Sequence, residues 1–189
     1  LTALSADQTL SGGIYYIDSN ITIPTPSTGK SGLVISGDVT LIFENNATLT
    51  VTGGAATDGT AGTHGKAGTG GSGAGAGIEL PKNSVLHIMG NGTVTANGGN
   101  AGNGGVTMKP EDAKGLTYGS GGGGGAGAGI GTKGASGGSG GEYGAQYSQS
   151  QVDGKPGGSG GTSAEMGKLI LTGNVAINVQ GGTIAATAA

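Results

Sequence analysis

Short runs of alternating apolar and polar residues recur along the chain and are separated by Gly or Asn. In residues 31–54 the runs are Leu33–Ile35, Val39–Phe43 and Thr48–Thr52. Alternation with a period of two places the apolar side chains on one face of a strand. The pattern therefore predicts an all-β fold built from short strands.

These runs belong to a unit that occurs three times, in residues 31–54, 76–99 and 166–189. The first unit aligns with the second if an insertion is placed near Asn45 and Asn46. The second aligns with the third without a gap at an offset of 90, which pairs Val85 with Val175. A divergent fourth unit precedes them, so the β-coils are expected at about 5–54, 76–99 and 166–189.

Three strands per unit with turn residues at the corners are typical of a short parallel β-solenoid (β-helix). Each coil of a solenoid buries little alone and is stabilised by stacking on the next coil. The alternative is a β-sandwich, which would show antiparallel hairpin signals instead of a recurring three-run unit.

Glycine changes this picture, because it makes up 48 of the 189 residues, whereas a soluble domain usually has roughly 7%. It is concentrated in two inserts between the coils, at about 55–75 and 100–165. In both inserts glycine recurs at every third position. In the first insert these positions are Gly59, Gly62, Gly65, Gly68 and Gly71.

A period of three is the repeat of the polyproline II helix, which has no internal hydrogen bonds. Glycine helices of this type are held together by hydrogen bonds to neighbouring helices, and glycine lets the backbones approach. The sequence predicts an inserted polyglycine II bundle, in which Val at Gly65 or Gly134 would be destabilising. A flexible linker is the alternative. The motif GAGAGI ends at Ile78 and at Ile130, which suggests that both helix ends dock on the solenoid.

The opening of the chain, TLSGGIYYIDSNITI followed by SGDVTLIF, resembles the start of many bacterial surface proteins with β-helical segments. This resemblance implies an extracellular adhesin module, 1–189, that is part of a larger surface protein. The period-three glycine resembles two other families, the receptor-binding tips of phage long tail fibres and the glycine-rich antifreeze proteins of springtails.

Charge and composition narrow the classes of function. The net charge is −3 with no basic cluster, which argues against a nucleic-acid partner. No apolar run approaches the roughly 18 residues of a membrane span. Cysteine is absent, so disulfides and thiol catalysis are excluded.

Residues for catalysis are sparse, so we expect no enzyme. His64 and His87 are expected to be structural. The β-helical polysaccharide enzymes need clustered acidic residues, whereas the three aligned units hold only Asp38, Glu44 and Glu79. Calcium is the one cofactor with candidate ligands, which are Asp112 with Glu111, or Asp153.

Tyrosine points to a binding site instead. Tyr118, Tyr143 and Tyr147 lie in the two non-repetitive stretches of the second insert, 106–119 and 142–155. Such rings stack on sugars or proteins, beside polar groups that orient the ligand. The predicted ligand-binding residues are Tyr118, Tyr143, Tyr147, Asp112, Glu142 and Gln146.

The expected ligand is a surface glycan or a receptor protein, although these tyrosines could instead cover the ends of the glycine bundle. Three other functions stay open: ice binding, a phage receptor-binding tip and a polysaccharide-active enzyme. Regular rows of threonine would favour ice binding, and Thr60, Thr63 and Thr69 supply only an irregular one.

Overall fold

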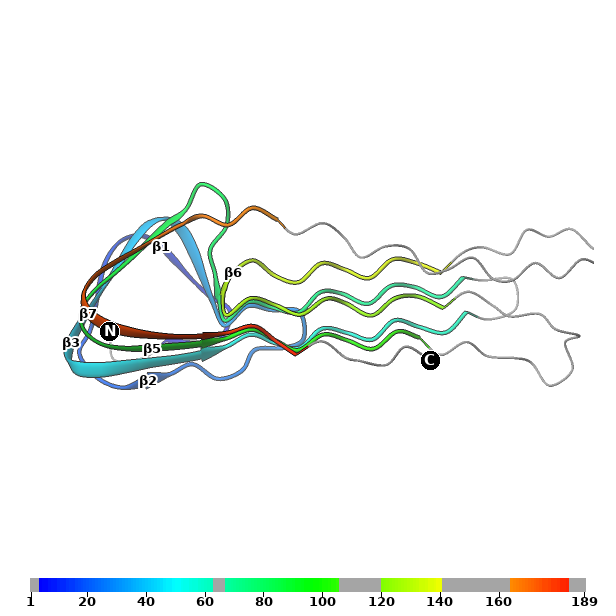
Figure 1. The fold of residues 1–189 in the computed structure, drawn as a ribbon, viewed down its shortest axis with the longest axis horizontal. Coiled ribbons are helices and arrows are strands. Elements are labelled where there is room, and N and C mark those ends of the chain that lie inside the picture. Colours follow the sequence, from blue (N-terminus) through cyan, green and yellow to red (C-terminus); the bar gives the residue numbers. More distant parts are fainter. Residues whose placement is uncertain (1–3, 63–66, 106–119, 141–163, 184–189) are drawn as a thin grey trace, which may run out of the picture.

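The fold is all-β, and the computed structural model describes residues 4–62, 67–105, 120–140 and 164–183. Within these residues there is no helix. A parallel sheet curls into a half-barrel, and wavy extended segments run from its open side (Figure 1). The strands are β1 (Gln8–Ile17), β2 (Ile21–Thr22), β3 (Leu33–Thr52), β4 (Ile78–Glu79), β5 (Val85–Asn97), β6 (Ile130–Gly131) and β7 (Lys168–Gln180).

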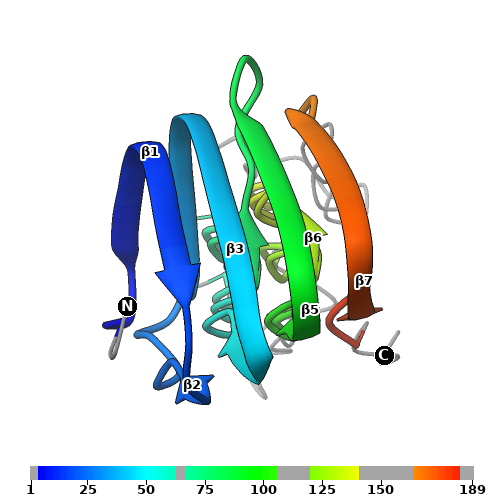
Figure 2. The ribbon, with the colours of Figure 1, turned by 90° about the vertical axis from the view of Figure 1, so that its left-hand side faces the viewer.

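The four long strands lie side by side in the order β1, β3, β5, β7, and every neighbouring pair is parallel. Figure 2 shows β1 and β7 at opposite ends of this row. The short strands β2 and β4 pair with β3, and β6 pairs with β4. Ile78 and Ile130 are partners in this last pair and are both buried, so the last residues of the two GAGAGI motifs lie side by side in the sheet.

The predicted short runs are joined in the structure into long bent strands. β3 is 20 residues long and includes all three runs of its unit. The predicted turn residues bend it without ending it: φ is 73° at Gly37, 54° at Asn45 and 56° at Asn46. Positive φ is accessible to Gly and to Asn at little cost, which explains why these residues stand at the bends.

Strand register tests the two alignments made from the sequence. Leu33 pairs with Ile78 and Thr52 with Asn97, so the alignment of the first two units is confirmed at both ends. The register shifts between Phe43 and Ala47, where one inserted residue is predicted, and β3 holds two extra residues there: Phe43 pairs with Gly90 and Ala47 with Gly92.

The gapless alignment of the second unit with the third is wrong. Val85 pairs with Lys168, not with Val175, and the offset is 83 residues along the whole of β5 and β7. This register brings Gly90 opposite Gly173, and these two residues have φ of 102° and 90°. The bends of the two strands therefore coincide.

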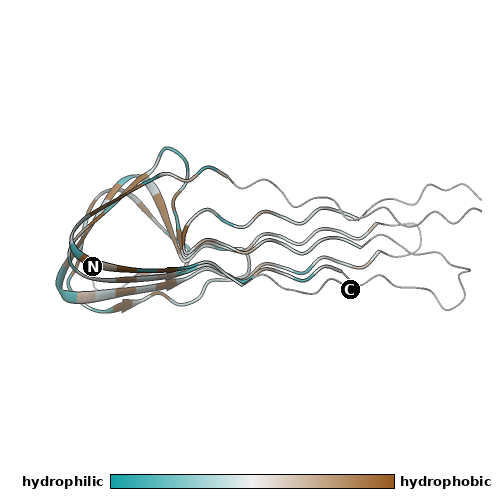
Figure 3. Ribbon diagram, in the orientation of Figure 1, coloured by the Kyte–Doolittle hydropathy of each residue, from teal (hydrophilic) through white to brown (hydrophobic). Residues whose placement is uncertain are grey.

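The hydrophobic core fills the concave side of the half-barrel. Alternate residues of β3 and β5 point inward and are fully buried, for example Leu41, Leu49, Ile88 and Val94. Figure 3 shows the resulting alternation along the strands and the paler colour of the glycine-rich segments. The sheet is thus apolar inside, whereas the segments that extend from it contribute few large side chains.

Backbone hydrogen bonds join the glycine-rich segments laterally. Segment 67–77 lies parallel to segment 120–129 and antiparallel to segment 132–140, and each contact repeats at every third residue. The donors to the first neighbour are Gly71, Ala74 and Gly77, bonded to Gly122, Gly125 and Ala128 at 2.9 Å. The donors from the second neighbour are Gly134, Gly137 and Gly140, bonded to Ala74, Gly71 and Gly68 at 2.8 Å.

The described part of the chain contains no helix of the length and apolar character that crossing a membrane would require.

Candidate functional site

All six predicted ligand-binding residues, which are Tyr118, Tyr143, Tyr147, Asp112, Glu142 and Gln146, lie outside the described residues. The same is true of His64 and of the calcium candidates Glu111 and Asp153. The described residues hold no group of three or more His, Cys, Asp or Glu that could bind a metal ion.

The residues that flank the first of these segments are described, and they lie together. The amide of Gly105 donates to the carbonyl oxygen of Gly121 at 2.8 Å, and Gly102 donates to Gly124 at 2.9 Å. These contacts join segments 98–105 and 120–129, which extend away from the sheet (Figure 1). The described backbones on either side of residues 106–119 are therefore hydrogen-bonded neighbours.

A regular grid of threonine covers the outer face of the sheet beyond its bends. Thr22, Thr50 and Thr95 are register partners across β2, β3 and β5. Thr48 and Thr93 form a parallel row two residues earlier. We call these five residues the threonine grid.

The side chains of the threonine grid point away from the core, because the residues between them, such as Leu49, Val51 and Val94, are fully buried. Thr22 is exposed and the other four are half-buried. Neighbouring strands lie about 4.8 Å apart, and alternate residues of one strand lie about 6.6 Å apart. The hydroxyl and methyl groups therefore repeat on a two-dimensional lattice.

Polar groups continue this face on both sides of the grid. In the next row Asn97 Nδ2 donates to Thr52 Oγ1 at 3.5 Å. Before the grid, the amide of Thr48 donates to Asn20 Oδ1 at 3.0 Å. These contacts restrict the side chains that border the grid.

On the N-terminal side of the bends at Asn45, Asn46 and Gly90, the outer face of the sheet is more apolar than at the threonine grid. Register places Tyr16, Ile42 and Met89 in one row across β1, β3 and β5. In the adjacent row His87 Nε2 lies 2.8 Å from Thr172 Oγ1. His87 thus forms a hydrogen bond between β5 and β7.

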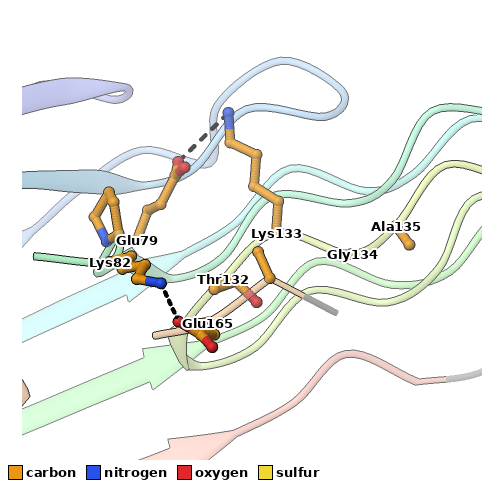
Figure 4. A pocket seen from close by; sticks show the side chains of 9 residues that line it. Glu79, Lys82, Thr132, Lys133, Gly134, Ala135 and Glu165 are labelled. Atoms are coloured by element: carbon orange, nitrogen blue, oxygen red, sulfur yellow. Dashed lines mark ion pairs between the residues drawn. The ribbon is translucent and has the colours of Figure 1, made fainter. Parts of the chain in front are cut away.

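A hollow of about 520 Å³ lies between β4, β6 and the residues before β7. Figure 4 shows two ion pairs at its wall, Lys82–Glu165 at 2.6 Å and Lys133–Glu79 at 3.4 Å. Glu79 also accepts a hydrogen bond of 2.7 Å from Ser31 Oγ. Each of the two carboxylates in the hollow therefore has a cationic partner.

No protein-family model, curated protein or solved structure matches the chain. The sheet and its outer faces are therefore interpreted from their own geometry.

The threonine grid was not predicted from the sequence. The row of threonines considered there was Thr60, Thr63 and Thr69. The signal is present, since threonine alternates with apolar residues in TLTVT (48–52) and TVTA (93–96). Recognising the grid also requires knowing which strands are neighbours, and that depends on the register.

Proposed function

We propose that this chain is a non-catalytic extracellular binding module in which a rigid support presents the segments 106–119 and 142–155 for recognition of a glycan or a receptor protein. The support has two parts, a β-solenoid and a polyglycine II bundle. The residues proposed to bind are the six named from the sequence, with the tyrosine rings as anchors.

The solenoid part of this proposal is supported by the parallel stacking of successive coils. β1, β3, β5 and β7 each belong to a different unit, and each pairs in parallel with the next. The bends also coincide between neighbours, as at Gly90 and Gly173. Stacked units that bury a common core are the defining feature of solenoids.

The polyglycine II part is supported by the direction and spacing of the backbone hydrogen bonds. Segment 67–77 bonds to three different segments, 53–60, 120–129 and 132–140. A β-strand has neighbours on only two sides, in the plane of its sheet. Bonds to a third neighbour, repeated every third residue, match a helix with three residues per turn.

The binding role rests on one observation, which is the hydrogen bond between Gly105 and Gly121. This bond joins the backbones that precede and follow residues 106–119 in the chain. Loops on a rigid support are the usual carriers of recognition, because their sequences vary while the support stays fixed.

The test is binding of the full chain to a glycan array and to candidate host-surface proteins, with the triple variant Tyr118→Ala, Tyr143→Ala and Tyr147→Ala. We expect the triple variant to lose binding while its circular dichroism spectrum and melting temperature stay unchanged. Tyr16→Ala is the matched control, because Tyr16 lies on the sheet. Equal binding by the triple variant, or its unfolding, would contradict the proposal.

Ice binding is the second candidate, and the threonine grid is the observation that favours it. Half-buried threonines on a stiff sheet hold their hydroxyl and methyl groups in fixed positions, so they can order water on a lattice. At the border of the grid, the Asn20 side chain is held by the backbone amide of Thr48 and the Asn97 side chain by Thr52 Oγ1, so these polar groups keep fixed positions beside the threonines.

A thermal hysteresis assay separates this candidate from the first. Thr50→Lys and Thr95→Lys should abolish hysteresis, because a long charged side chain interrupts the grid. Thr9→Lys is the control, since Thr9 is an exposed threonine of β1 outside the grid. Absence of hysteresis in the unaltered chain rules out ice binding and leaves the first proposal untouched.

A further inference from the structure

Among the strands that the structure describes, β7 is an edge strand with one open side. Within the described residues, β7 has β5 as its only neighbour in the sheet, along all 13 of its residues. Figure 2 shows it at the end of the row of long strands. An edge of this length presents a template for pairing with another strand.

The apolar interior is also uncovered at this edge. Leu171 pairs with Ile88, and Val179 pairs with Ala96. The two β5 residues are fully buried, whereas Leu171 and Val179 are each 51% exposed. Both β7 residues occupy inward-facing positions, so their exposure comes from the lack of a neighbouring strand beyond β7 among the described residues and not from an outward orientation.

The opposite end of the row is closed. At β1 the inward-facing Leu10 and Ile17 are buried, and Leu4 and Ala6 pack against the same core from the segment before the strand. The register of β1 is also interrupted by a shift between Ser11 and Gly13. Coverage and irregularity are the means by which proteins protect sheet edges from further pairing.

Within the part of the chain that the structure describes, β7 has neither form of protection, and it also lacks the charge that blocks edges. Its sequence KLILTGNVAINVQ contains no proline and a single charged residue, Lys168 at its first position. Its register with β5 runs without a shift from one end to the other. Charged residues and prolines are what edge strands use against self-association.

We propose that the β7 edge is an interface with a second copy of this chain. The contact extends the ladder already formed by β1, β3, β5 and β7, and it buries Leu171 and Val179 of both copies. A closed dimer requires a twofold axis and therefore the same surface from each copy. The two β7 strands then run antiparallel, and the first residue of one lies opposite the last residue of the other.

This arrangement fits the charges on the strand. Lys168 of each copy is placed opposite the uncharged end of β7, at Gln180, so the two lysines stay apart. The bend at Gly173 lies near the middle of the strand, so the axis passes close to it and the two curled strands bend at the same level. The interface is self-complementary in both charge and shape.

The experiment is sedimentation-velocity ultracentrifugation of the full chain over a range of micromolar concentrations, since an interface made by one strand is small and weak. We expect a reversible monomer–dimer equilibrium. Leu171→Lys and, separately, Val179→Lys should leave only monomer. Ile14→Lys is the matched control, because Ile14 is 63% exposed on β1, and this variant should dimerise like the unaltered chain.

Hydrogen exchange gives a second measurement that does not depend on any variant folding. Amides of residues 168–180 should exchange more slowly as the concentration rises, while those of β1 should not change. Three outcomes would overturn the proposal: a monomer at every concentration, open-ended oligomers instead of a dimer, or a dimer that survives both lysine substitutions.

Discussion

A single methyl group decides whether two glycine-rich segments can lie together. A Cβ built at Gly102 would overlap the carbonyl oxygen of Thr57, whereas one at Gly104 would lie 3.9 Å from its nearest neighbour, the Gly121 oxygen. Both residues belong to the same segment and neither has a positive φ. The difference between them is therefore one of space and not of backbone conformation.

Gly102→Ala should lower the free energy of unfolding by about 1–3 kcal/mol, in line with overpacking in a filled interior. Gly104→Ala should change it by less than about 0.5 kcal/mol, as expected at an open site. Urea denaturation followed by circular dichroism measures both values. Equal stability of the two variants would show that the segments are not packed at Gly102.

The predicted cost of Val at Gly134 has the same physical origin, because a Cβ there would overlap the carbonyl oxygen of Gly125. Gly134 also donates a hydrogen bond of 2.8 Å to Ala74, which a shifted backbone would lose. Gly65, the other position named from the sequence, lies outside the described residues. The substitution therefore stays a prediction at both sites.

At the scale of single elements, the bends of the long strands depend on particular residue types more strictly than the apolar runs do. Asn45 and Asn46 are exposed, and both have positive φ. Their role is conformational, because Asn tolerates this region better than other residues with a side chain. The bend turns β3 from the apolar outer face toward the threonine grid.

Asn46→Ala should therefore cost about 1 kcal/mol of stability, since an alanine in the left-handed region is strained by about that amount. Asn46→Gly should be neutral or slightly stabilising, because glycine adopts this conformation freely. Thermal denaturation of the two variants makes the comparison. If both lose the same stability, the Asn46 side chain forms a contact that the bend does not explain.

The bends also explain which part of the fold was predictable. Alternation and turn residues were sufficient to predict an all-β fold with stacked units, and the first two units were aligned correctly at their ends. The alignment with the third unit failed because it matched Gly92 and Thr93 to Gly182 and Thr183, in a region rich in both residue types. Opposing Gly90 and Gly173 is the correct choice, and it depends on φ values that no residue count supplies.

The site was less predictable than the fold. The tyrosines were predicted to bind a ligand because aromatic side chains are rare in this glycine-rich sequence. The threonines of the grid, by contrast, are not unusual within any single strand. Its regularity exists only between strands, where Thr50 meets Thr95. A periodic surface is a property of the register, so it could not be read before the register was known.

For the whole molecule, the sheet and the glycine-rich segments are continuous through the same strands. β3 runs directly into segment 53–60, and β5 runs into segment 98–105. The backbone hydrogen bonds between these neighbours also continue past the strands. Gly53 donates to Asn97, Ala56 to Asn100 and Gly59 to Asn103. The register of the sheet therefore fixes the register of the segments beyond it.

This continuity predicts a specific pattern of hydrogen exchange in segment 53–60. The amides of Ala56 and Gly59 donate to backbone oxygens at 2.8 Å. Among the described residues, those of Ala55 and Asp58 have no such partner. Ala56 and Gly59 should be protected and Ala55 and Asp58 should exchange rapidly, as NMR would resolve; uniform rapid exchange would mean that the segment is not bonded laterally.

The same continuity predicts that the sheet and the segments unfold together. Leu49 is fully buried in the core, and Leu49→Ala should destabilise the fold by about 2–5 kcal/mol, the usual cost of such a truncation. Because segment 53–60 is held in register by β3, protection at Ala56 and Gly59 should fall by the same free energy, although neither residue is altered.

Thr50→Ala is the control for this experiment, since its side chain lies on the outer face beside Leu49 and is only half-buried. It should leave protection at Ala56 and Gly59 within about 0.5 kcal/mol of its original value. Two results would contradict a single cooperative unit: unchanged protection at these amides in Leu49→Ala, or separate melting transitions for β3 and for segment 53–60. In either case the glycine-rich segments would be stabilised by their own hydrogen bonds alone, and the core would serve only to place their first residues.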